Sequence, residues 1–170
     1  MTPRDILHKW LIYALGLVPI WMLDAFILNR YPVWGVAPTL LPLAVTAVAV
    51  LEGANGGGGF GLGVALFWVM CYPTGDSWLI LLLTLTGMAI GGISQYALSK
   101  SYPSFLLCSV CTLILLDAPK ILHRFLFRSV ALPDMLHLAT RECLLSLLWS
   151  PVVYLIFRLV YRKVGGSKLA

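Results

Sequence analysis

The sequence has few charged residues for a chain of its length. Of its 170 residues, 11% are charged and 60% are hydrophobic, and the mean hydropathy is +0.91. Soluble domains carry about 25% charged residues, because polar side chains must cover their core. The low charge therefore excludes an ordinary soluble domain. Apolar runs separated by short polar stretches indicate one integral membrane domain over residues 1–170, with no soluble domain attached.

The motifs of metal binding and catalysis are also missing. His8, His123 and His137 show no H-E-x-x-H or other paired-ligand spacing. Cys108 and Cys111 form a C-x-x-C, but within an apolar run and without a second ligand pair, so small buried hydrophobes are favoured over a metal or redox site. No G-x-S-x-G occurs, and no pair of acids shares one helical face for acid–base chemistry. We expect no enzyme, no metal and no cofactor.

The net charge of +5 comes from basic residues at the ends of the apolar runs. This placement is typical of topology signals and of contact with anionic lipid, and it argues against a nucleic-acid surface. A six-helix arrangement puts seven of the twelve basic residues on the side of the termini and five on the other side. The excess of positive charge predicts cytoplasmic N- and C-termini.

The apolar runs predict an all-α bundle of about six transmembrane helices. A helix rises 1.5 Å per residue, so about 20 residues cross a hydrocarbon core of ~30 Å. The predicted helices cover residues 10–28, 33–51, 58–72, 78–98, 104–127 and 144–161.

The fifth helix is the least regular, because its apolar run, Ser104–Leu116, is too short to cross alone. Asp117-Ala118-Pro119 resembles a helix start, with an N-cap acid and an early proline. The residues that follow at helical spacing form one polar stripe: Asp117, Lys120, Arg124 and Arg128. This segment is either a kinked continuation of the fifth helix, broken near Pro119, or a short amphipathic helix in the membrane interface, which we favour.

Glycines dominate the junction between the second and third helices. Glu52 is followed by seven glycines among the eleven residues from Gly53 to Gly63. Small residues four apart allow helix backbones to approach closely in lipid. The residues predicted to pack helices or to bind a partner are Glu52, Gly53, Gly57, Gly59, Gly61, Gly63, Gly87 and Gly91.

Four acids lie near predicted helix ends. For Asp24, Asp117 and Glu142, an interfacial or capping role is favoured over a catalytic one, because an acid inside the hydrocarbon core is costly. For Glu52 the interfacial or capping role and the catalytic role both stay open, since glycines bring bare backbone amides next to it.

The order of these features resembles the rod shape-determining protein MreD family. The resemblance begins with Pro38-Thr39-Leu40-Leu41-Pro42, continues through Leu51-Glu52-Gly53 and Gly59-Phe60-Gly61-Leu62-Gly63, and includes the helix with Leu83-Thr84-Leu85-Thr86-Gly87. The end, Leu148-Trp149-Ser150-Pro151-Val152-Val153-Tyr154 with a basic tail, is similar too. Many family members carry an acid late in the helix after the glycines, where this chain has Trp68-Val69-Met70.

The resemblance implies a scaffold of the bacterial inner membrane that binds the single-pass protein MreC and helps organise peptidoglycan synthesis near MreB and the RodA synthase. The alternative is the substrate-binding membrane subunit of an energy-coupling-factor vitamin transporter, which has similar size and six helices. The Ala-x-x-x-Ala usual on its first helix is missing, since Ala14 and Ala25 are eleven residues apart. An intramembrane enzyme acting on lipid would need clustered polar residues.

Overall fold

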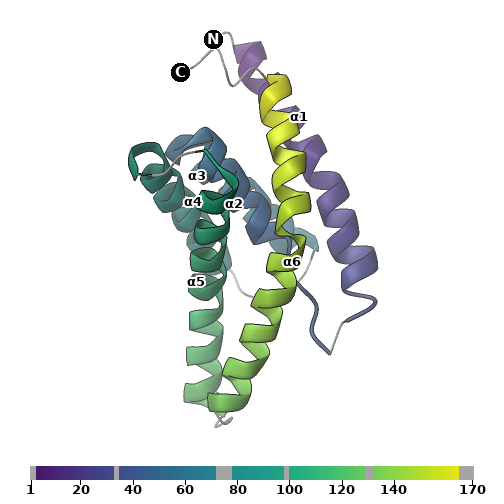
Figure 1. The fold of residues 1–170 in the computed structure, drawn as a ribbon, viewed down its shortest axis with the longest axis vertical. Coiled ribbons are helices and arrows are strands. Elements are labelled where there is room, and N and C mark those ends of the chain that lie inside the picture. Colours follow the sequence, from purple (N-terminus) through teal and green to yellow (C-terminus); the bar gives the residue numbers. More distant parts are fainter. Residues whose placement is uncertain (1–2, 33–34, 72–77, 98–99, 129–131, 165–170) are drawn as a thin grey trace.

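The computed structural model of the chain is a helical bundle (Figure 1), described for residues 3–32, 35–71, 78–97, 100–128 and 132–164. These residues contain no strand, so the predicted all-α class is confirmed. The helices are α1 (Pro3–Met22), which continues into the π-helical turn η1 (Leu23–Leu28), α2 (Leu41–Glu52), α3 (Ala54–Cys71), α4 (Trp78–Ala97), α5 (Tyr102–Arg128) and α6 (Leu132–Val164).

Five of the helical segments are long and apolar enough to cross a membrane. The remaining helix, α2, is apolar but has only 12 residues, which is about 18 Å at 1.5 Å per residue. The start of α1 and the end of α6 lie at the same end of the bundle (Figure 1). These features describe a multi-pass membrane protein.

Helix α2 lies at the centre of the bundle. It packs against every other α-helix, and its residues from Leu41 to Leu51 are all buried. Because apolar neighbours surround it on all sides, it needs no polar face.

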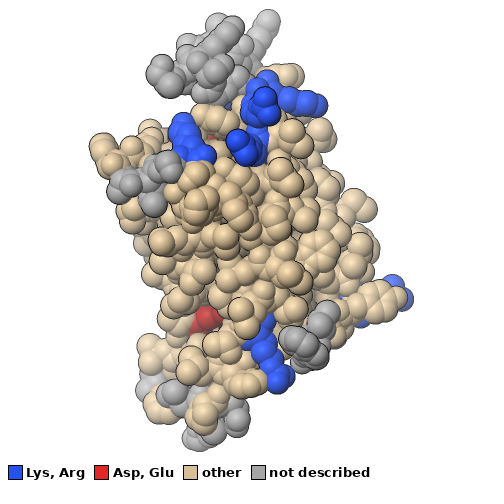
Figure 2. Space-filling view, viewed as in Figure 1, with Lys and Arg blue, Asp and Glu red and all other residues tan. Residues whose placement is uncertain are grey.

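The outer faces of the long helices are apolar. On α1, the side chains of Leu11, Leu15, Val18 and Met22 are about half exposed or more and follow one face of the helix. Figure 2 shows a broad surface without charged side chains between two ends that carry the visible ones. This distribution fits a bundle surrounded by lipid.

The prediction of a helix over residues 33–51 is wrong in its first half. Residues 33–34 lie outside the described part, and the chain from Gly35 to Leu40 is not helical. Pro38 and Pro42 explain the late start, because the residue before a proline avoids the helical conformation and Pro42 is tolerated only in the first turn. The third helix starts at Ala54, earlier than predicted, and includes the glycines.

The segment after Leu116 continues α5 instead of forming a separate helix. Helix α5 runs through Pro119 to Arg128 as one element, so the favoured prediction of a separate amphipathic helix is wrong and the segment continues the fifth helix. The stretch between the predicted helices 104–127 and 144–161 is also helical from Leu132 onward, where Pro133 and Asp134 are residues suited to a first turn. As a result, α5 and α6 form a long hairpin that extends beyond the other helices at the end opposite the termini (Figure 1).

Candidate functional site

The turn between α2 and α3 is a sharp break made by one residue. Gly53 has φ +87° and ψ −168°, a conformation that disfavours residues with a side chain. Its N–H donates to the Ala49 carbonyl (3.0 Å) and its own carbonyl accepts from the Gly57 N–H (2.8 Å), so the backbone stays hydrogen-bonded across the break. The turn directs Glu52, the last residue of α2, toward α1.

Two side chains of α1 bind the Glu52 carboxylate. The Tyr13 hydroxyl donates to Oε1 (2.7 Å), and the Lys9 ammonium contacts Oε2 as an ion pair. Lys9 and Tyr13 are four residues apart and therefore share one helix face. The side chains of Lys9 and Glu52 are only 19% and 12% exposed. The carboxylate thus joins α1 to the α2–α3 turn, a role that the sequence left open.

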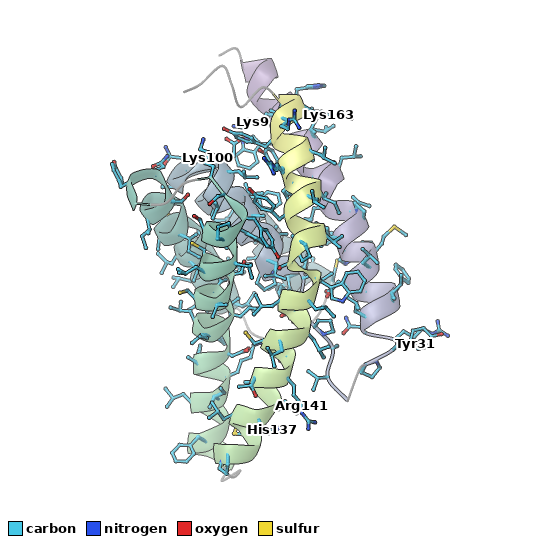
Figure 3. All side chains as sticks on the ribbon, viewed as in Figure 1. Lys9, Tyr31, Lys100, His137, Arg141 and Lys163 are labelled. Carbon is cyan, nitrogen blue, oxygen red and sulfur yellow. The ribbon has the colours of Figure 1, made fainter. Side chains whose placement is uncertain are left out.

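Gly56 and an aromatic cluster enclose this contact. A methyl group at Gly56 would lie 2.5 Å from Glu52 Cβ, so glycine leaves room for the acid. Tyr13 is fully buried, with its ring centroid 6.3 Å from that of Phe157 and 6.1 Å from that of Phe60. The ion pair therefore lies beside an apolar cluster drawn from α1, α3 and α6. Figure 3 shows Lys9 at the same end of the bundle as Lys100 and Lys163.

The seam between α3 and α4 contains five of the predicted glycines. A methyl group at Gly57 would lie 2.4 Å from the Gly87 carbonyl oxygen, and one at Gly91 would lie 2.4 Å from the Gly53 carbonyl carbon. At Gly61 the nearest atom would be the Leu83 carbonyl oxygen at 2.8 Å. The two backbones are in contact over two helical turns, as small residues permit.

Gly59 and Gly63 lie on another face of α3. A methyl group at Gly59 would make an ordinary contact with Trp10 at 3.5 Å, and one at Gly63 would meet nothing within 4 Å. Both residues line a pocket of about 390 Å³ between α1 and α3. Gly59 and Gly63 therefore line a groove between α1 and α3 and take no part in the α3–α4 seam.

Asp24 lies at the opposite end of α2 from Glu52. It is 5% exposed and its Oδ1 accepts the Leu40 N–H at 3.4 Å, from the residue preceding α2. Beside it, the Thr39 N–H donates to Ser146 Oγ of α6 (3.0 Å). A carboxylate near a helix N-terminus is favourable, and this contact ties η1 to the residue that precedes α2.

Other polar contacts inside the bundle were not predicted from the sequence. Thr46 and Thr112 join α2 to α5 through their hydroxyls (3.1 Å), and Ser94 Oγ of α4 donates to the Val50 carbonyl (3.0 Å). The sequence signal for such contacts is the presence of Ser and Thr within apolar runs, but it does not show which of these residues form hydrogen bonds with each other.

Only part of the predicted polar stripe can be followed. Asp117 accepts a hydrogen bond from Lys120 within α5 (2.9 Å) and is buried. Arg124 and Arg128 continue the helix, and their side chains lie outside the described residues. Over the part of the chain that is described, no three His, Cys, Asp or Glu side chains come together as a metal site.

Fold and contacts define the class as a multi-pass, all-α membrane bundle whose helices are joined by glycine seams and a few polar pairs. Comparison with family models, with curated proteins and with solved structures found no match.

Proposed function

We propose that the chain is a membrane scaffold of the MreD type. In this proposal it lies in the bacterial cytoplasmic membrane with both termini inside the cell. It binds a single-pass partner of the MreC type and helps organise peptidoglycan synthesis during elongation, near a RodA-type synthase and MreB. In this proposal the chain acts by binding other proteins and does not catalyse a reaction.

One observation carries the proposal: the polar side chains that the sequence marked as candidates for chemistry are engaged in holding helices together. Glu52 binds Lys9 and Tyr13, and Asp24 accepts the N–H of Leu40 just before α2. Three of the glycines that carry the family resemblance, Gly53, Gly61 and Gly87, lie in the tight α3–α4 seam. A rigid bundle of this kind supports a role in binding another membrane protein.

Depletion of the protein in its host tests the proposal. We expect rod-shaped cells to widen and become round, and a labelled wall precursor to lose its incorporation along the side wall. Expression of the wild-type chain should restore both. Normal width and normal side-wall labelling after full depletion would contradict a role in elongation.

The alternative, a substrate-binding subunit of a vitamin transporter, has one observation in its favour. The pocket between α1 and α3, about 390 Å³, lies within the range of ~300–1,000 Å³ typical of small-ligand sites. Its walls are apolar and aromatic, whereas a vitamin needs placed polar groups for recognition. A vitamin retained through purification, or an attached ATPase module, would favour the transporter.

A further inference from the structure

Several basic side chains gather at the end of the bundle where α1 starts and α6 ends (Figure 2). Four of them are exposed and either precede α5 or belong to α6: Lys100, Arg158, Arg162 and Lys163. In the described residues none of these four forms an ion pair, and Glu52, an acid at this end, is already bound by Lys9. This end of the molecule therefore presents positive charge to an anion.

Two of the four cations are held in place by tyrosines of α6. The Lys100 ammonium donates to the Tyr161 hydroxyl (2.9 Å) and lies 5.2 Å from the centroid of that ring. The Arg158 guanidinium carbon lies 5.9 Å from the ring centroid of Tyr154, whose hydroxyl donates to the Lys100 carbonyl (3.3 Å). Tyr154, Arg158 and Tyr161 are spaced by four and three residues, so they share one face of α6. Lys100 and Arg158 are thus held side by side.

The chemistry of this pair suits a phosphate group. Contact with an aromatic ring orients a cation and limits its side-chain freedom before a ligand arrives. The Arg158 guanidinium donates no hydrogen bond to the part of the chain that the structure describes. Its planar fork can therefore bind two oxygens of one phosphate, while the Lys100 ammonium adds a second positive charge.

The position of the pair indicates that the phosphate belongs to a lipid. Leu155 and Leu159 are 56% and 58% exposed and belong to the outward, lipid-facing stripe of α6. Arg158 lies one helical turn from Leu155, and Arg162 lies one turn beyond Leu159, so the apolar stripe ends at these two cations. A phosphate bound here has its acyl chains beside the exposed leucines, whereas a free phosphate would make no apolar contact.

We propose that Lys100 and Arg158 bind the phosphate of an anionic membrane phospholipid, with its acyl chains along the Leu155 side of α6. Two cations without a described acid partner favour a headgroup with net negative charge, because the ammonium of a zwitterionic headgroup would be repelled. The inference requires only the membrane bundle and does not depend on the proposed scaffold function.

Native mass spectrometry of the full-length chain, released from detergent micelles, tests the site. The probe is phosphatidylglycerol, and phosphatidylcholine with the same acyl chains is the reference lipid. Both lipids carry a phosphate, but only the first has a net negative charge. We expect phosphatidylglycerol to bind roughly tenfold more tightly or better, since each basic residue near an anionic lipid surface contributes about fivefold in affinity.

Single substitutions separate the site from general positive charge. Arg158→Gln and Lys100→Gln should each weaken phosphatidylglycerol binding about fivefold. Lys163→Gln removes one charge at the same end (Figure 3), from an exposed position without a printed tyrosine contact, and should change binding by no more than about twofold. Tyr161→Phe keeps the ring but removes the acceptor of the Lys100 hydrogen bond, so it should weaken binding by less than Lys100→Gln. Thermal unfolding shows whether each variant folds.

Four results would overturn the site. Equal binding of the two lipids would contradict the preference for an anion, and equal losses in Lys163→Gln and Arg158→Gln would show that position does not matter. Displacement of phosphatidylglycerol by millimolar inorganic phosphate would indicate an anion site that does not require a lipid. An Arg158→Gln variant that loses a protein partner but binds phosphatidylglycerol as before would assign the pair to that partner. Failure of the scaffold proposal, with the lipid preference intact, would leave the site standing.

Discussion

Glu52 is bound by a cation and a phenol that both come from α1, so its charge is neutralised where water is scarce. Lys9→Met leaves the carboxylate with only the Tyr13 hydroxyl. The Glu52 charge would then stay largely buried without its cation, which is unfavourable. We therefore expect a loss of about 1–3 kcal/mol in the free energy of unfolding. Chemical unfolding in detergent micelles measures it.

The double variant Lys9→Met/Glu52→Gln controls this prediction. It removes both charges, so it should recover most of the lost stability. Lys163→Met, at an exposed position of α6, should change stability by less than about 0.5 kcal/mol. Equal effects of Lys9→Met and Lys163→Met would show that the ion pair does not hold α1 in place.

Gly53 is a second position where one residue determines the path of the chain. Its φ of +87° disfavours any residue with a Cβ, so Gly53→Ala should cost about 1–3 kcal/mol. A methyl group at Gly53 would also lie 2.0 Å from Gln95 Nε2, whereas Gly35 has φ +77° and nothing within 4 Å, so Gly35→Ala is a control for positive φ without a contact. A Gly53→Ala variant as stable as the wild type would contradict the sharp turn, and thermal unfolding provides the comparison.

At the scale of elements, the α3–α4 seam depends on glycines whose hydrogens face backbone atoms. Gly57→Ala puts a methyl group 2.4 Å from a carbonyl oxygen, so the helices must separate, at a cost of about 1–3 kcal/mol or more. Gly63→Ala enters open space on the same helix and should stabilise it by roughly 0.5–1 kcal/mol. Thermal unfolding of the two variants should therefore shift in opposite directions, and shifts of the same sign would refute the assignment of faces.

The sequence predicts these elements unevenly. Apolar length identifies α3, α4 and α6 because hydrophobic spans are a strong signal, and the Gly57 and Gly87 seam follows from spacing. The late start of α2 and the helical path through Pro119 depend on buried surroundings that local patterns do not contain. The role of Glu52 could not be predicted either, since Lys9 lies 43 residues away in the chain.

At the scale of the whole molecule, the start of α1 and the end of α6 share one end of the bundle, while Arg141 lies toward the other (Figures 1 and 3). With cytoplasmic termini, a membrane-impermeant maleimide should label Arg141→Cys but not Lys163→Cys in spheroplasts, in a background without native cysteines. After the membrane is opened, both should react. Labelling of Lys163→Cys alone in sealed spheroplasts would invert the topology.

The scaffold proposal requires that the chain binds a partner protein. The most direct measurement is the mass of the complex that co-purifies with the tagged full-length chain from its host membrane. The proposed function predicts a single-pass membrane protein of the MreC type in defined stoichiometry with the chain, retained by Gly92→Leu and lost or weakened in Gly61→Leu, which forces α3 and α4 apart. A chain that carries a vitamin or an ATPase module and no single-pass partner would contradict it.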